Sequence, residues 1–116
     1  MNKICTDIYQ SKKFIGLGID VNTADMRWQN NEFQIGFNDD GIPAWSLSAL
    51  LELIPKLYEE ENNPDDGGCQ PNLCKGWDNN QWHIVYRSSI YITEWYDDPI
   101  DAAFEMICWL LENKKL

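Results

Sequence analysis

The stretch that decides the fold lies at the end of the chain, where residues 97–112 read DDPIDAAFEMICWLLE. Asp98 suits the N-cap of a helix, because its carboxylate can accept hydrogen bonds from the free N–H groups of the first turn. Pro99 then falls at the first helical position, where its missing N–H costs nothing. Apolar residues follow at helical spacing and form one stripe: Ile100, Ala103, Phe104, Ile107, Cys108 and Leu111. The stretch therefore predicts a core helix that packs over a sheet.

Two further helices are predicted upstream. Over residues 7–17, Asp7 and Gln10 have the spacing of a capping box, and Gly18 suits the left-handed residue that ends a helix. A shorter helix is predicted to begin after Ser46, which is a good N-cap, and to end at Pro55, whose ring disrupts a helix.

The strands are predicted from alternation of apolar and polar residues. This pattern occurs at residues 26–29, 32–37, 72–77, 82–87 and 90–95. Residues 30–31 and 78–80 are rich in Asn and Asp and suit the turns between successive strands. The sequence thus predicts a single α+β domain over residues 1–116, with three helices packed on one antiparallel sheet of about five strands in two layers.

Length and composition limit the class of protein. A chain of 116 residues, 44% hydrophobic, is the size of one folded domain. No apolar run approaches the length of about 20 residues that crosses a bilayer. The first residues lack the apolar centre of a secretory signal. We therefore expect a cytoplasmic protein without a membrane partner.

The charge is strongly negative. Nineteen acidic residues against nine basic ones give a net charge of −10. Such a surface repels phosphate backbones, so direct binding of nucleic acid is not expected. The predicted partner is another protein of basic character, or a second copy of this chain. An acidic inhibitor that imitates nucleic acid is an alternative.

The most polar stretch, residues 59–70, is predicted to form an exposed acidic loop. Its five acids are candidate interaction residues: Glu59, Glu60, Glu61, Asp65 and Asp66.

The four cysteines have two interpretations. In a reducing cytoplasm they are free thiols, and Cys5 and Cys108 suit apolar packing. Cys69 and Cys74, however, are separated by four residues, and His83 follows nine residues later. A structural zinc site takes four such ligands, often paired at two to four residues. The favoured interpretation is that these cysteines are free thiols and that the protein has no cofactor. The alternative is a zinc ion bound by Cys69, Cys74 and His83, although the sequence nearby offers no fourth ligand.

The sequence contains no recognisable catalytic motif. His83 is the only histidine, and neither Ser88 nor Ser89 belongs to a nucleophile motif with it. A glycine-rich phosphate loop is absent as well. We therefore predict a protein that is not an enzyme.

Six tryptophans are many for this length. Trp45 and Trp109 fit the predicted core, whereas Trp77, Trp82 and Trp95 lie on or beside adjacent strands. Because Trp is favoured at interfaces, these three are the predicted aromatic interaction patch.

Several blocks of the chain resemble known sequences. Residues 43–55 (PAWSLSALLELIP) and 101–113 (DAAFEMICWLLEN), together with residues 5–7 and 22–26, resemble blocks in small uncharacterised proteins of phages and mobile elements of gut anaerobic bacteria. The resemblance covers both ends of the chain but not the acidic loop. It implies a shared fold and a mobile-element origin, and it implies no activity, cofactor or catalytic residue.

The favoured hypothesis is a non-enzymatic interaction or accessory protein of mobile-element origin. It would bind another protein through the aromatic face of its sheet or through its acidic loop. A small zinc-binding domain and an acidic nucleic-acid mimic remain the alternatives.

Overall fold

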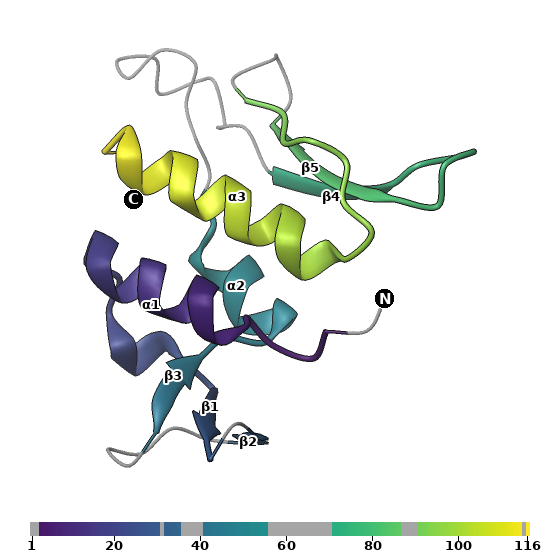
Figure 1. Ribbon diagram of the computed structural model, residues 1–116. Helices are drawn as coiled ribbons and strands as arrows, with labels where there is room; N and C mark the ends of the chain where they lie inside the picture. Colours follow the sequence, from purple (N-terminus) through teal and green to yellow (C-terminus); the bar gives the residue numbers. More distant parts are fainter. Residues whose placement is uncertain (1–2, 31, 36–40, 56–70, 87–90, 115) are drawn as a thin grey trace.

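A computed structural model describes residues 3–30, 32–35, 41–55, 71–86, 91–114 and 116 (Figure 1). Its elements follow in the order α1 (Ile8–Leu17), the 3-10 helix η1 (Val21–Thr23), β1 (Met26–Gln29), β2 (Glu32–Ile35), β3 (Ile42–Ala44), α2 (Leu47–Leu53), β4 (Pro71–Lys75), β5 (Trp82–Tyr86) and α3 (Pro99–Glu112). The described part of the chain is therefore α+β, as predicted.

Helix α3 confirms the prediction made for the end of the chain. The Oδ1 atom of Asp98 accepts a 2.9 Å hydrogen bond from the N–H of Ile100, and Pro99 occupies the first turn. Helix α3 is buried along more than one side, as its broad apolar surface requires. Its buried residues are Pro99, Ile100, Ala102, Ala103, Met106, Ile107, Cys108 and Leu110.

The caps of the other two helices are also those predicted. Asp7 and Gln10 form a complete capping box, with bonds of 2.7 Å to the N–H of Gln10 and 3.0 Å from the N–H of Asp7. Gly18 ends α1 in the left-handed region at φ 93°. Ser46 caps α2 by accepting a hydrogen bond from the N–H of Ala49, and α2 ends before Pro55.

The prediction of one sheet with about five strands is wrong. The described strands form two antiparallel sheets, one in the order β2-β1-β3 and the other made of β4 and β5. β3 was not predicted, because three residues that include Pro43 carry too little alternation to be recognised. The strand predicted at residues 90–95 makes one isolated bridge to β5 in its described part, between Ile92 and Val85. Tyr96, directly after the predicted strand, makes a second isolated bridge, with Trp82.

The two sheets are separate because each covers a different side of the helices. In Figure 1 the three helices lie between the β1-β2-β3 sheet and the β4-β5 sheet. β5 presents Ile84 and Tyr86, both fully buried, to the main core around α3. The other sheet contributes Met26 and Ala44 to a smaller cluster with Cys5. The chain passes from β3 directly into α2, and among the described residues no strand is shared by the two sheets.

The main core is aromatic at its centre. Phe14 of α1 meets Trp45 edge to face, with 5.3 Å between the ring centroids. Both side chains are fully buried, as is Leu50 of α2. Burial of such rings is worth roughly 1.5–3 kcal/mol each, so this contact between α1 and the start of α2 is a principal source of stability.

The helices can also be compared with the thickness of a bilayer. None of those in the described residues has both the length and the apolarity needed to cross a membrane. The longest, α3, has 14 residues, against the roughly 20 that a span requires.

Candidate functional site

The β4-β5 hairpin carries most of the residues predicted to form a site. β4 pairs with β5 from Pro71 opposite Tyr86 to Lys75 opposite Trp82. Ile84 and Tyr86 are buried, so alternation places Trp82 on the same, core-side face. His83 and its partner Cys74 then lie on the outer face.

The loop at the end of this hairpin has a defined structure. The N–H of Gly76 donates a 2.7 Å hydrogen bond to the carbonyl of Gln81. The Oδ1 atom of Asn79 accepts one of 3.1 Å from the N–H of Gln81, and Asn80 takes a positive φ of 56°. Asn79 Oδ1 also lies 1.7 Å from the position that a Cβ on residue 76 would occupy, so a larger residue there would displace the Asn79 side chain. The loop therefore holds residue 77 in a definite place.

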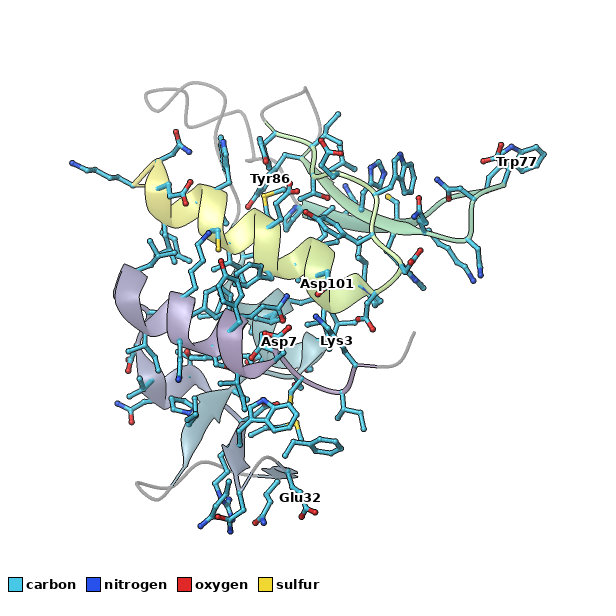
Figure 2. All side chains as sticks on the ribbon, viewed as in Figure 1. Lys3, Asp7, Glu32, Trp77, Tyr86 and Asp101 are labelled. Carbon is cyan, nitrogen blue, oxygen red and sulfur yellow. The ribbon has the colours of Figure 1, made fainter. Side chains whose placement is uncertain are left out.

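Trp77 lies at the tip of this loop, far from the body of the molecule (Figure 2). Its side chain is 95% exposed, more than any other large apolar residue of the described chain. An indole with so little contact contributes little to folding, whereas the same ring can bury a large area against a partner.

Trp82 borders a hollow at the loop end of the β4-β5 ladder. The hollow has a volume of about 470 Å³ and is lined by Lys75, Asn80, Trp82 and Asp97. The Nζ atom of Lys75 lies 5.6 Å from the centroid of the Trp82 ring, a cation–π contact. Trp82 is held in place by two backbone hydrogen bonds with Tyr96, of 2.6 and 2.8 Å.

Trp95 lies on the outer face. Its ring stacks on His83, with 3.8 Å between the centroids and 11° between the planes. Beside it, Ile92 is paired with Val85 and is 49% exposed. The three predicted tryptophans thus belong to one hairpin and its flanking segment, but they lie on different surfaces: Trp77 at the tip, Trp82 on the core side and Trp95 outside.

The structure brings together two of the three predicted zinc ligands. Cys74 and His83 are direct neighbours across the β4-β5 ladder, and the buried Nδ1 atom of His83 has no hydrogen-bond partner among the described residues. Cys69 lies outside the described residues. Within them, no three potential metal-binding side chains gather in one place.

The two other cysteines are buried away from this pair. Cys5 belongs to the small cluster with Met26, and Cys108 lies on α3 in the main core. Burial, assisted by the charges of Asp25 and Asp7, raises the pKa of the Cys5 thiol to about 11. Burial raises the pKa of Cys108 to about 11 as well. Both are free thiols that fill apolar space, as predicted.

The predicted acidic loop lies outside the described residues. This applies to Glu59, Glu60, Glu61, Asp65 and Asp66. Their proposed part in binding therefore stays a prediction.

Sequence reasoning missed a carboxylate that positions the segment beside the hairpin. Glu105 of α3 accepts hydrogen bonds from the hydroxyls of Tyr91 (2.9 Å) and Tyr96 (2.6 Å). Burial and the bond to Glu105 raise the pKa of Tyr91 to about 12, and the same causes raise the pKa of Tyr96 further. Tyr91 also stacks on Trp109 of α3, at 4.5 Å between centroids. These contacts hold residues 91–96 against α3 and so place Trp95 and Asp97.

A second missed cluster joins the start of the chain to two helices. Lys3 Nζ forms ion pairs with Asp7 of the α1 cap (3.2 Å) and Asp101 of α3 (2.5 Å), as Figure 2 shows. Burial by itself lowers the pKa of Lys3, but the hydrogen bonds and charges of Asp101 and Asp7 outweigh it and raise the pKa. Gln10 donates to Asp101 as well, at 2.8 Å. Every member is engaged with the others, so this cluster supports the fold.

A smaller hollow of about 180 Å³ lies next to that cluster, lined by Lys3, Ile4, Cys5, Asp7, Trp28 and Phe33. Trp28 meets Phe33 edge to face at 5.9 Å, and its Nε1 donates to the carbonyl of Thr6 at 2.8 Å. These contacts fix Trp28, whereas Ile4 and Phe33 stay exposed. The hairpin, with the more exposed Trp77, is the stronger candidate.

The hairpin does not assemble a catalytic triad among the described residues. Cys74 lies opposite His83, but the described residues offer the His83 Nδ1 no carboxylate to orient the ring. Ser88 and Ser89 lie outside the described residues.

Comparison with known proteins returned no similar chain. No protein-family model matches the sequence, and neither does any curated protein or solved structure.

Proposed function

We propose that this protein is a non-enzymatic interaction protein, of mobile-element origin, that binds another protein through its β4-β5 hairpin with Trp77 as the anchor. The observation that supports the proposal is the 95% exposure of Trp77 at the tip of a defined loop. Tryptophan is enriched among the few residues that supply most of an interface's binding energy.

The loop favours binding because it is already organised. Hydrogen bonds from Gly76 and to Asn79 shape it without a partner. A group held in its bound position loses less conformational entropy on association, so more of the contact energy appears as affinity. Trp77 is therefore suited to enter an apolar pocket on the partner.

The charge indicates the chemistry of that partner. With a net charge of −10, the chain attracts basic proteins at long range and repels acidic ones. Asp78 follows Trp77 directly and is exposed, so the pocket that receives the indole should have a positive rim. We place the interaction in the cytoplasm, because free thiols at Cys5, Cys74 and Cys108 suit a reducing compartment.

The test is capture of host proteins by the purified chain and by Trp77→Ala. The control is Tyr9→Ala, which removes a 72% exposed ring from α1, on another element. We expect proteins captured by the parent to be retained by the Tyr9 variant and lost by the Trp77 variant. Loss of the anchor should weaken binding about 30-fold, since truncating such a residue costs about 2 kcal/mol or more. Equal capture by all three proteins would contradict the proposal.

A second candidate function is zinc binding, favoured by the pairing of Cys74 with His83 and by the unpartnered Nδ1 atom in the described structure. Thiolate and imidazole are both zinc ligands. Native mass spectrometry with added zinc should then show one ion per chain, and Cys74→Ser should lose it. An unfolding temperature that a strong chelator leaves unchanged in the zinc-loaded protein would contradict this candidate.

A further inference from the structure

The hollow at the loop end of the β4-β5 ladder combines four kinds of group. Its lining provides an indole face from Trp82, a carboxylate from Asp97, an amide from Asn80 and an ammonium from Lys75. Its volume of about 470 Å³ lies within the range of ligand pockets, roughly 300–1,000 Å³. It can therefore accommodate a long, polar side chain.

The Trp82 ring already attracts a cation of its own chain. Lys75, opposite Trp82 in the ladder, places its Nζ atom 5.6 Å from the ring centroid. This ammonium makes no ion pair with Asp97 in the described structure, although both line the hollow. The contact shows that the ring face is suited to a positive group, and Trp82 is among the residues that line the hollow.

The carboxylate of Asp97 is oriented but not saturated. Its Oδ1 atom accepts a 3.1 Å hydrogen bond from the Nε2 of Gln81. A carboxylate has about four acceptor positions, so Asp97 can accept further hydrogen bonds from a ligand. Asp97 is exposed, so those positions face solvent.

We infer that this hollow binds an arginine side chain of the partner protein. The guanidinium stacks on Trp82 in the place of the Lys75 ammonium and donates hydrogen bonds to Asp97 and to the amide oxygen of Asn80. Arginine fits better than lysine, because its plane is weakly hydrated, stacks on aromatic rings and presents several donors at once. The net charge of −10 favours a basic partner in the same way.

This inference deepens the proposed function, since it names the chemistry of the partner. The hollow and Trp77 both lie at the loop end of the hairpin. A partner that binds the Trp77 indole can therefore also place an arginine in the hollow. Trp77 does not line the hollow, however. The two contacts can therefore be tested separately.

The experiment is a titration of the purified protein with acetyl-Gly-Arg-Gly-amide, followed by the NMR signals of the six indole N–H groups. The signal of Trp82 is assigned with Trp82→Phe. The matched ligand is the same peptide with citrulline, which keeps the shape of arginine and removes its charge. We expect the arginine peptide to move the Trp82 signal and leave that of buried Trp45 in place, and the citrulline peptide to bind at least about tenfold more weakly.

Two variants should change this affinity in opposite directions. Asp97→Asn should weaken binding of the arginine peptide about tenfold, whereas Lys75→Met, which removes the competing cation, should tighten it. The controls change the same charges elsewhere: Glu52→Gln on α2 and Lys12→Met on α1, both exposed. Changes as large in the controls would overturn the inference, and so would equal binding of the citrulline peptide or a Trp82 signal that does not move.

Trp77→Ala separates this inference from the proposed function. It should abolish capture of the partner and leave binding of the arginine peptide unchanged. Peptide binding without capture by the parent would contradict the proposed function alone. Capture that depends on Trp77, with no peptide binding by the parent, would contradict the arginine site alone.

Discussion

The hydroxyl of Tyr96 donates a 2.6 Å hydrogen bond to the carboxylate of Glu105. This bond joins the segment after β5 to the middle of α3, and the second oxygen of Glu105 accepts a hydrogen bond from Tyr91. Tyr96 in turn bonds to Trp82 through its backbone, so one carboxylate positions the loop end of the β4-β5 ladder.

Glu105→Gln should therefore lower the free energy of unfolding by about 1–3 kcal/mol, because the amide offers one acceptor oxygen to two tyrosine hydroxyls. The measurement is urea denaturation. Glu112→Gln, which neutralises an exposed acid on the same helix, should change stability by less than about 0.5 kcal/mol. An equal loss in the two variants would show that Glu105 acts only through its charge.

The tyrosines predict how stability depends on pH. The pKa of Tyr86 and that of Tyr91 are each raised from 10.0 to about 12 in the folded state, mainly by burial. The folded protein thus holds these protons more tightly than the unfolded chain. Their contribution is complete below pH 10 and is lost as the pH rises from about 10 to about 12. Urea midpoints measured across this range should fall.

Tyr91→Phe tests the cause of this fall. The variant removes one of the shifted groups, so its stability should decline less steeply above pH 10 than that of the parent. Identical slopes would mean that Tyr91 titrates normally in the folded protein.

Gly16 within α1 and Gly18 at its C-cap should respond to alanine with opposite signs. A Cβ at Gly16 meets nothing within 4 Å, so Gly16→Ala should stabilise the protein by about 0.5–1 kcal/mol through better helix propensity. Gly18 has φ 93°, where alanine is strained, so Gly18→Ala should destabilise it by about 1 kcal/mol. Thermal unfolding of the two variants is the measurement. Stabilisation by Gly18→Ala would contradict the left-handed end of α1, and destabilisation by Gly16→Ala would contradict the open space around Gly16.

The ion pairs of Lys3 should contribute more to the free energy of unfolding than an ordinary exposed charge does. Lys3→Met removes the partner of Asp7 and Asp101 and should cost about 1 kcal/mol. Lys12→Met, on the exposed side of α1, should cost almost nothing. Comparison of urea midpoints at low and high salt provides the check, because added salt should reduce the difference between the Lys3 variant and the parent.

The helices could be predicted because their signals are local. The capping box of Asp7 with Gln10 and the Asp98-Pro99 start lie within four residues of the turns they stabilise. The β4-β5 hairpin is local as well, and its turn falls beside the predicted Asn79 and Asn80.

The pairing of the strands could not be predicted in the same way. β3 pairs with β1 although β2 lies between them in the sequence, so the place of β3 depends on contacts distant in sequence. Beside β5, the N–H of Ile84 donates to the side-chain Oγ1 of Thr93 at 2.9 Å. This bond to a side chain takes the place of a regular ladder bond. Residues 91–96 therefore pair with β5 through isolated bridges instead of a continuous ladder.

The candidate site was predicted in part. Trp77 was predicted at the end of a strand, whereas β4 ends at Lys75 and Trp77 lies in the turn that follows. Alternation alone also could not show that Trp95 would stack on His83 or that Lys75 would lie over Trp82. The Tyr91 and Tyr96 bonds to Glu105 join an irregular segment to a helix, and no sequence spacing indicates them.

The most direct test of the central claim follows Trp77 itself during binding. The chain is labelled with 5-fluorotryptophan, the Trp77 signal is assigned with Trp77→Phe, and the ¹⁹F spectrum is recorded before and after addition of the captured partner. The account predicts that the Trp77 signal shifts and becomes insensitive to the solvent, as its exposed ring is buried, while that of Trp45 stays in place. A bound complex in which the Trp77 signal keeps its position and its solvent sensitivity would contradict the account.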